Sequence, residues 1–458
     1  MMPALTLAAV ARTLDAACDA GSVPLSGVVM DSRTVSPGDL FVALRGQRVD
    51  GHRYVAAAAA AGAVAAIVEE PVDAAIPCIV VGDTLQALTR LGAANRAAYS
   101  GELAAITGSC GKTSVKNMCR AILQRVGATV ATAGNYNNEI GVPLTLTRLD
   151  GSTRFAVVEM GATQRGDIRH LCALATPRVS TVLNAMEAHL DGFGSVAEVA
   201  QVKGEIYDGL PPGGIAVLNI DQSWADLWRQ RIAAAGAHEL SCSLHSPADI
   251  TVSALRDLGL EGSVFRLHLG GLSRTLTLRQ PGQHSVANAL AAAGIASAMG
   301  ADIDQIAEGL ARTEVEPGRL QTVPLDAGRV LIDDSYNANP GSARAAIELL
   351  AQAPGPTLLI LGEMLELGAQ SAARHAEMGA LAKQRDIARF IGVGAALLPA
   401  VEAFGSTGEW FADRESLIEA LPRLLEDAGT ILVKGSRGAG MESIQAAIRE
   451  IAGGADLC

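Results

Sequence analysis

The segment Ile106-Thr107-Gly108-Ser109-Cys110-Gly111-Lys112-Thr113-Ser114 decides the fold that we predict for this chain. It follows an apolar run, 103–106, which indicates a buried strand, and it precedes a segment, 115–126, whose apolar residues recur at helical spacing. A glycine-rich turn between a strand and a helix forms a cradle for phosphate, because backbone N–H groups and the helix dipole point at the anion. The sequence therefore predicts a phosphate-binding loop at the centre of an α/β domain.

The residue types in this loop suit a nucleotide. The amine of Lys112 is expected to reach the terminal phosphates, and the hydroxyl of Thr113 is expected to hold magnesium. Only two residues separate the glycines where the usual nucleotide loop has four, so an ordinary glycine turn is the alternative. The predicted nucleotide-binding residues of the loop are Gly108, Ser109, Cys110, Gly111, Lys112, Thr113 and Ser114.

Length and composition set the broad class of protein. At 458 residues the chain is too long for one core, and we expect about three domains. The net charge of −12 argues against a nucleic-acid partner, so local positive groups must hold any phosphate ligand. Seven cysteines without metal-type spacing are typical of reduced thiols in a cytoplasm. Because the N-terminus has no signal-peptide pattern and the apolar run 55–68 is too short for a membrane span, we expect a cytoplasmic protein.

The order of predicted elements divides the chain into three α/β units, 1–98, 99–315 and 316–458. The second unit is built on the phosphate loop, and the third reads as a smaller doubly wound sheet. Polar clusters follow the predicted strands in the second and third units. Since ligands bind outside the carboxyl ends of such strands, we expect these two units to face a shared cleft.

Three polar side chains in the second unit are candidates for the reaction site. Glu159 ends a short apolar strand, which is where a magnesium ligand is expected beside a phosphate loop. His189 lies just past the strand 179–183, and Lys203 lies on the predicted helix 195–209. The alternatives are an exposed carboxylate, a loop histidine and a solvated lysine.

Taken in order, these motifs resemble the Mur ligase family of peptidoglycan synthesis. The family-wide marks are the loop 107–113, Glu159, His189, Lys203 and the helix start with Gly282, His284 and Asn288. The segments 134–143, 334–340 and 433–438 are similar to those of the member that adds a dipeptide. Cys110 stands where serine is common, and Glu363 stands where aspartate is expected.

The resemblance implies an α/β protein of three domains: a UDP-sugar-binding domain, a central P-loop domain with a mostly parallel sheet, and a Rossmann-like domain. It implies an ATP-dependent ligase that uses magnesium and joins D-alanyl-D-alanine to UDP-N-acetylmuramoyl-tripeptide through an acyl phosphate, as a monomer. Another ATP-dependent amide ligase, such as a folylpolyglutamate synthetase, and a P-loop protein without ligase activity are the alternatives. Whether the tripeptide ends in diaminopimelate or lysine stays open.

The resemblance also implies roles for individual residues. Catalytic roles fall to Lys112, Lys203, His189 and Glu159, and Lys203 is expected to be carbamylated so that it ligates a second magnesium. Thr113, Glu159, His189 and Lys203 are the implied metal ligands. The implied nucleotide contacts beyond the loop are His284, Asn288, Arg319 and Asp334. The implied substrate contacts are Ser32, Arg33, Asn135, Asn138, Asn337 and Asn339.

Overall fold

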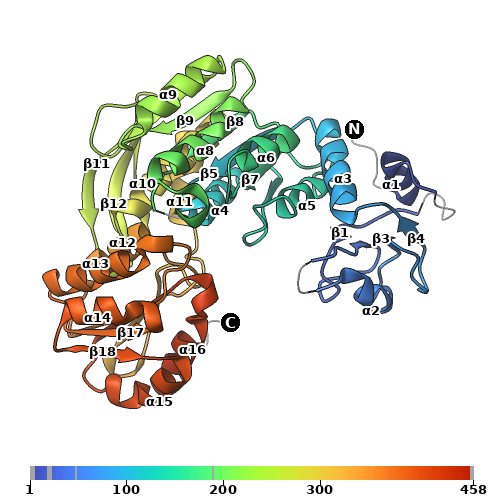
Figure 1. The fold of residues 1–458 in the computed structure, drawn as a ribbon. Helices are drawn as coiled ribbons and strands as arrows, with labels where there is room; N and C mark the ends of the chain where they lie inside the picture. Colours follow the sequence, from blue (N-terminus) through green and yellow to red (C-terminus); the bar gives the residue numbers. More distant parts are fainter. Residues whose placement is uncertain (1–5, 18–22, 47–48, 188–189, 454–458) are drawn as a thin grey trace.

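The computed structural model describes residues 6–17, 23–46, 49–187 and 190–453. Three α/β units follow one another along the chain, and the predicted fold class is confirmed. In Figure 1 the central unit lies between an N-terminal unit, in blue on the right, and a C-terminal unit, in orange and red at the lower left. No helix in the described ranges is both long and apolar enough for a membrane crossing.

The N-terminal unit is a small parallel sheet with helices on both faces. Its strands lie in chain order: β1 (Val28–Val29), β2 (Leu40–Val42), β3 (Ala65–Val68) and β4 (Cys78–Val80). Helices α1 (Leu7–Leu14) and α3 (Thr84–Ala98) cover one face, and α2 (Val55–Ala61) covers the other. Helix α3 also packs against α5 (Gly141–Thr147), which joins this unit to the central one (Figure 1).

The central unit contains a nine-stranded sheet in the order β13-β12-β11-β10-β9-β8-β5-β7-β6. The strands from β6 to β11 run parallel, whereas β12 and β13 form an antiparallel hairpin. The strands are β5 (Glu102–Thr107), β6 (Thr129–Ala131), β7 (Phe155–Glu159), β8 (Val179–Val182), β9 (Ile215–Asn219), β10 (His238–Ser243), β11 (Ile250–Asp257), β12 (Ser263–Leu269) and β13 (Leu272–Leu278).

Two layers of helices bury this sheet. One apolar cluster joins one face to α4 (Lys112–Leu123), α10 (Gln283–Ala298) and α11 (Ile303–Ala311). A second cluster joins the other face to α5, α6 (Asp167–Ala175), α8 (Val196–Asp208) and α9 (Ala225–Ala234), near the short helix α7 (Leu190–Phe193). Because β5 lies between β7 and β8, its carboxyl end is a point where the chain turns to either side of the sheet, the usual place for a ligand in such folds.

The C-terminal unit has a six-stranded sheet in the order β14-β15-β19-β16-β17-β18, in which only the edge strand β14 is antiparallel. The strands are β14 (Gln321–Pro324), β15 (Val330–Asp334), β16 (Thr357–Gly362), β17 (Arg389–Val393), β18 (Gly408–Phe411) and β19 (Thr430–Lys434). Helices α12 (Pro340–Leu350), α13 (Ser371–Gln384) and α14 (Leu398–Phe404) cover one face, and α15 (Arg414–Leu424) and α16 (Glu442–Ile451) cover the other.

Candidate active site

The phosphate loop between β5 and α4 is held in shape by neighbouring side chains. The side chain of Asn184, just past β8, accepts a hydrogen bond from the N–H of Cys110 at 3.0 Å and donates one to its carbonyl at 3.1 Å. Gly111 has φ +83°, and a Cβ there would lie 2.6 Å from Oδ1 of Asn288. Only glycine therefore fits this position, and Asn288 lies directly against the loop.

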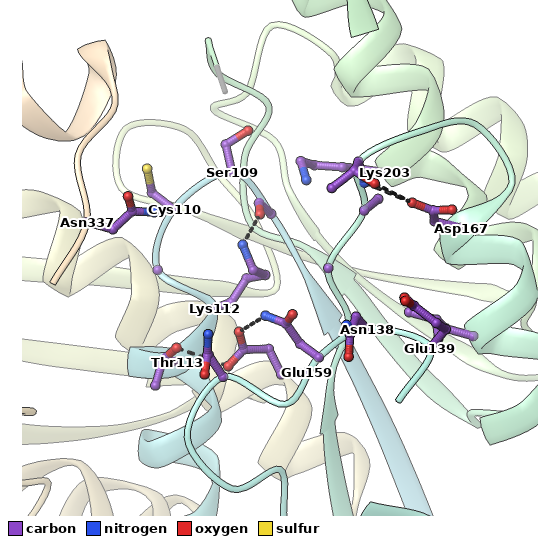
Figure 2. Close-up of a pocket in the computed structure, with 18 of the residues that line it drawn as sticks. Ser109, Cys110, Lys112, Thr113, Asn138, Glu139, Glu159, Asp167, Lys203 and Asn337 are labelled. Carbon is purple, nitrogen blue, oxygen red and sulfur yellow. Dashed lines mark hydrogen bonds between the residues drawn. The ribbon is translucent and has the colours of Figure 1, made fainter. Parts of the chain in front are cut away.

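The side chains of Lys112 and Thr113, at the start of α4, make different contacts. Nζ of Lys112 donates to the carbonyl of Gly108 at 2.7 Å, so the amine curls back over the loop (Figure 2). The hydroxyl of Thr113 donates to Oε2 of Glu159 at 3.0 Å, and it accepts a hydrogen bond from Nη2 of Arg319 at 3.0 Å. Arg319, from the segment between α11 and β14, therefore contacts the first turn of α4.

Glu159 ends β7 as predicted and is only 1% exposed. Its second oxygen, Oε1, accepts a hydrogen bond from the side chain of Asn137 at 2.7 Å (Figure 2). The carboxylate of Glu159 and the hydroxyl of Thr113 are hard oxygen donors beside the loop, and this donor set fits magnesium, which keeps several water ligands. His189 lies outside the described residues, and within the described ones no three His, Cys, Asp or Glu side chains gather into a metal cluster.

Lys203 lies on α8 and faces the same cavity (Figure 2). Its side chain is 2% exposed. Removal from water, together with the charge of Lys112, lowers the pKa of Lys203 to about 7. The neighbouring Glu205 does not share this site, because its carboxylate accepts the N–H groups of Gly166 and Arg169 at the start of α6.

These groups line one cavity of about 400 Å³ between the phosphate loop and the C-terminal unit. Lys112, Glu159 and Lys203 lie on the side of the central unit, while Arg319 and Asn337 close the opposite side. The cavity therefore joins cations and a carboxylate in the arrangement that transfer of a phosphoryl group requires.

A second cavity, of about 180 Å³, continues from the loop between the central and C-terminal units. Its lining includes eight of the predicted nucleotide contacts: Ser109, Cys110, Gly111, Ser114, His284, Asn288, Arg319 and Asp334. Oδ2 of Asp334 accepts a hydrogen bond from Nζ of Lys434 at 2.5 Å, and the same amine donates to the carbonyl of Asn337 at 2.9 Å. The two cavities share Ser109, Cys110 and Gly111, so the loop connects them.

The four asparagines predicted as substrate contacts differ in what their side chains do. Asn138 accepts hydrogen bonds from the N–H groups of Ile140 and Gly141 at the start of α5. Asn339 caps α12 and also donates to Sγ of Cys110 at 3.1 Å, across the two units. Asn135 and Asn337 are exposed in the lining of the cavity of about 400 Å³. Oδ1 of Asn337 accepts the N–H group of Ala338 at 2.9 Å and that of Arg437 at 3.4 Å.

Ser32 and Arg33 are not brought to the phosphate loop. The Arg33 side chain is 86% exposed and pairs with Asp31 at 2.6 Å, which lowers the pKa of Asp31 to about 2. A cavity of about 830 Å³ lies beside them between the N-terminal and central units, and its lining includes Asp31, Tyr136 and Arg148 but neither Ser32 nor Arg33.

Several residues of the site were not predicted. Asn184 and Asn137 brace the loop and Glu159, and Lys434 pairs with Asp334. Lys116 is 3% exposed and donates to the carbonyl of Gly134 at 3.0 Å, at the start of the loop that carries Asn137. The sequence could have pointed to Lys116, because it lies four residues after Lys112 and residues i and i+4 share one face of a helix.

Comparison with known proteins agrees with this geometry. Three domain families match in order: "Mur ligase family, catalytic domain" over 24–99, "Mur ligase middle domain" over 106–296, and "Mur ligase, glutamate ligase domain" over 318–437. The solved MurF from Acinetobacter baumannii is similar with a TM-score of 0.88 at 32% identity, over 98% of this chain and 99% of that one. MurF from Thermotoga maritima, solved with ADP, is similar with a TM-score of 0.78 at 27% identity, over 93% and 97% of the two chains.

A curated relative extends the similarity to the full length of the sequence. It is the UDP-N-acetylmuramoyl-tripeptide–D-alanyl-D-alanine ligase of Escherichia coli strain K12. The two sequences are 41% identical over 452 residues, which cover 98% of this chain and 99% of the relative. Because the similarity spans all three units and includes the phosphate loop, this chain belongs to the Mur ligase family.

Proposed function

We propose that this chain is an ATP-dependent ligase that adds D-alanyl-D-alanine to UDP-N-acetylmuramoyl-tripeptide. The products are UDP-N-acetylmuramoyl-pentapeptide, ADP and phosphate. One observation carries the proposal: Lys112, Glu159, Lys203 and Arg319 converge on one cavity, in a chain similar over its whole length to ligases with this name. We propose that the units 1–98, 99–315 and 316–458 act as three domains, and that the enzyme works as a monomer in the cytoplasm.

In the first step, an oxygen of the tripeptide carboxylate attacks the γ-phosphorus of ATP. The bond from that phosphorus to the bridging oxygen of ADP breaks, and an acyl phosphate forms. Two anions meet in this step, so positioning and positive charge must supply most of the catalysis. Lys112 lies over the loop and Arg319 lies at Thr113, and we assign both cations to the γ-phosphate.

In the second step, the amine of the dipeptide attacks the acyl carbon. A C–N bond forms, the C–O bond to phosphate breaks, and phosphate leaves with the electron pair while the amine loses a proton. Both steps act on the same carboxyl group of the tripeptide, first at its oxygen and then at its carbon, so one cavity of about 400 Å³ beside the loop can serve both.

Magnesium fits the oxygen atoms of Thr113 and Glu159, and when bound it would neutralise phosphate charge. We further propose that Lys203 is carbamylated and that His189 assists it in holding a second ion. The low pKa of Lys203 supports this proposal, because a neutral amine is the form that reacts with carbon dioxide. Carbamylation converts a cation into an anion with oxygen ligands, which suits a hard cation.

A phosphate-release assay tests the proposal. With ATP, UDP-N-acetylmuramoyl-tripeptide and D-alanyl-D-alanine we expect phosphate release, and mass spectrometry should find the pentapeptide product. Omission of the tripeptide should stop the release. Release that is independent of the tripeptide would instead indicate a P-loop protein without ligase activity. Activity only with a folate acceptor would indicate the folylpolyglutamate synthetase alternative, which the full-length similarity does not favour.

A further inference from the structure

We infer that Tyr336 is a positioning residue that aims the guanidinium of Arg319 at the phosphate loop. The inference rests on the proposed function, since it concerns how the nucleotide site becomes complete. Tyr336 follows β15 by two residues and lies in the lining of both cavities. The ring centroid of Tyr336 is 4.1 Å from Cζ of Arg319.

The backbone of Arg319 is fixed to the C-terminal sheet. The N–H of Tyr336 donates to the carbonyl of Gly318 at 3.0 Å, and the N–H of Leu320 donates to Oδ1 of Asp334 at 3.2 Å. Both neighbours of Arg319 are therefore attached to the end of β15. Because of these contacts, the arginine must move with the C-terminal unit, and its side chain is the part that crosses to the central unit.

The side chain of Arg319 is held by a ring face and a hydroxyl. Its guanidinium stacks on Tyr336 and donates to Thr113 at 3.0 Å, and in the described part of the chain it has no carboxylate at ion-pair distance. A carboxylate partner would neutralise the guanidinium and compete with phosphate. An aromatic face orients the same planar group and leaves its charge and its outer N–H groups available.

Arg437 provides an internal comparison, because it contacts the same ring. Its Cζ is 5.2 Å from the ring centroid of Tyr336, but its guanidinium pairs with Glu442 at 2.5 Å and its side chain is 66% exposed. The charge of Arg437 is therefore already compensated and faces solvent. Tyr336 thus contacts two arginines. Arg437 is neutralised by Glu442, whereas Arg319 is directed at the phosphate loop, so Tyr336 positions Arg319.

The test compares Tyr336→Leu with Tyr336→Phe, alone and combined with Arg319→Ala. Loss of the aromatic face should raise the Kd of a nonhydrolysable ATP analogue or the KM for ATP by roughly 3- to 30-fold, the range for one cation–π contact. Tyr336→Phe keeps the face and should stay within about 2-fold of wild type. In the Arg319→Ala background, Tyr336→Leu should have no further effect, because the two side chains act as one unit.

Three results would overturn the inference. The first is a loss in Tyr336→Leu that persists undiminished in the Arg319→Ala background, which would place the ring against the nucleotide itself. The second is an equal loss in Tyr336→Phe, which would assign the role to the hydroxyl. The third is an equal loss in Arg437→Ala, which would make that arginine the relevant partner. Analogue binding does not depend on the acceptor substrate, so these outcomes are distinct from a failure of the proposed ligase reaction. Melting temperatures of the variants distinguish a loss of binding from a loss of stability.

Discussion

Replacement of Lys203 by alanine should remove most of the turnover and leave the fold intact. The reasoning starts from the pKa of about 7 that burial and Lys112 impose on the amine. At pH 7.5 a lysine with its ordinary pKa is neutral in only about one molecule in 10³, whereas a pKa near 7 leaves roughly three quarters neutral. The site therefore raises the fraction of neutral Lys203, the form that reacts with carbon dioxide, by about 10³-fold.

The sign of the pH dependence follows from the same shift. The neutral amine attacks the carbon of carbon dioxide, an N–C bond forms, and one proton is released. As pH falls through about 7, protonation of Lys203 competes with this reaction, so the carbamate and the turnover should both decline. Added bicarbonate should restore part of the lost turnover on the acid side, because mass action favours the adduct.

Three measurements check this prediction. Labelling with ¹³C carbon dioxide should give one carbamate signal in the wild type and none in Lys203→Ala. Acetate should partly rescue Lys203→Ala by placing a carboxylate in the vacated space, whereas sodium chloride at equal ionic strength should not. Lys383 is the matched control, because it is an exposed helix lysine and Lys383→Ala should keep both the signal and the turnover. A fully active Lys203→Ala enzyme, or active wild type without any adduct, would refute the reasoning.

Two further substitutions separate catalytic from structural contacts. Lys112→Ala should lower turnover by about 10²- to 10³-fold, as for one preorganised electrostatic contact, with an unchanged melting curve; near-normal turnover would contradict its role. Asn339→Ala removes the side-chain cap of α12 and should destabilise the C-terminal unit by about 1 kcal/mol, measured by urea unfolding. An unchanged midpoint would show that the cap contributes little.

The strands that carry the loop and Glu159 were predictable because nearly all of their residues are buried. The run Phe155–Glu159 is buried at every position, and apolar runs of this length between turns indicate strands. By contrast, β10 is mostly half-buried or exposed, most of β11 is exposed, and both carry polar residues, so no apolar period marks them. The start of α4 was placed three residues too late, at Val115, because its first turn is polar where it faces the cavity.

The proximity of the loop and Glu159 could be predicted from the sequence, since the loop follows one strand and Glu159 ends another strand of one parallel sheet. The pairing of Asp334 with Lys434 could not, because these residues are 100 positions apart and meet only through the order of β15 and β19. Likewise, the sequence does not reveal which asparagines cap helices. Asn138, Asn337 and Asn339 are the same residue type. Only the structure shows that Oδ1 of Asn138 and of Asn339 accepts an N–H group at the start of a helix, whereas Oδ1 of Asn337 accepts the N–H groups of Ala338 and Arg437.

The distribution of lysine explains how an acidic chain holds polyanions. The sequence contains only five lysines, and all but Lys383 brace or line the two cavities. Burial lowers the pKa of Lys112, Lys116 and Lys203. The free protein therefore has a desolvation cost for the charged form of each of these amines. A phosphate group at the loop would relieve that cost for Lys112 by favouring its charged form, whereas the proposed carbamate would replace the positive charge of Lys203. The binding of a polyanion is therefore strengthened locally, where the amines lie, although the net charge of −12 repels the same ligand at a distance.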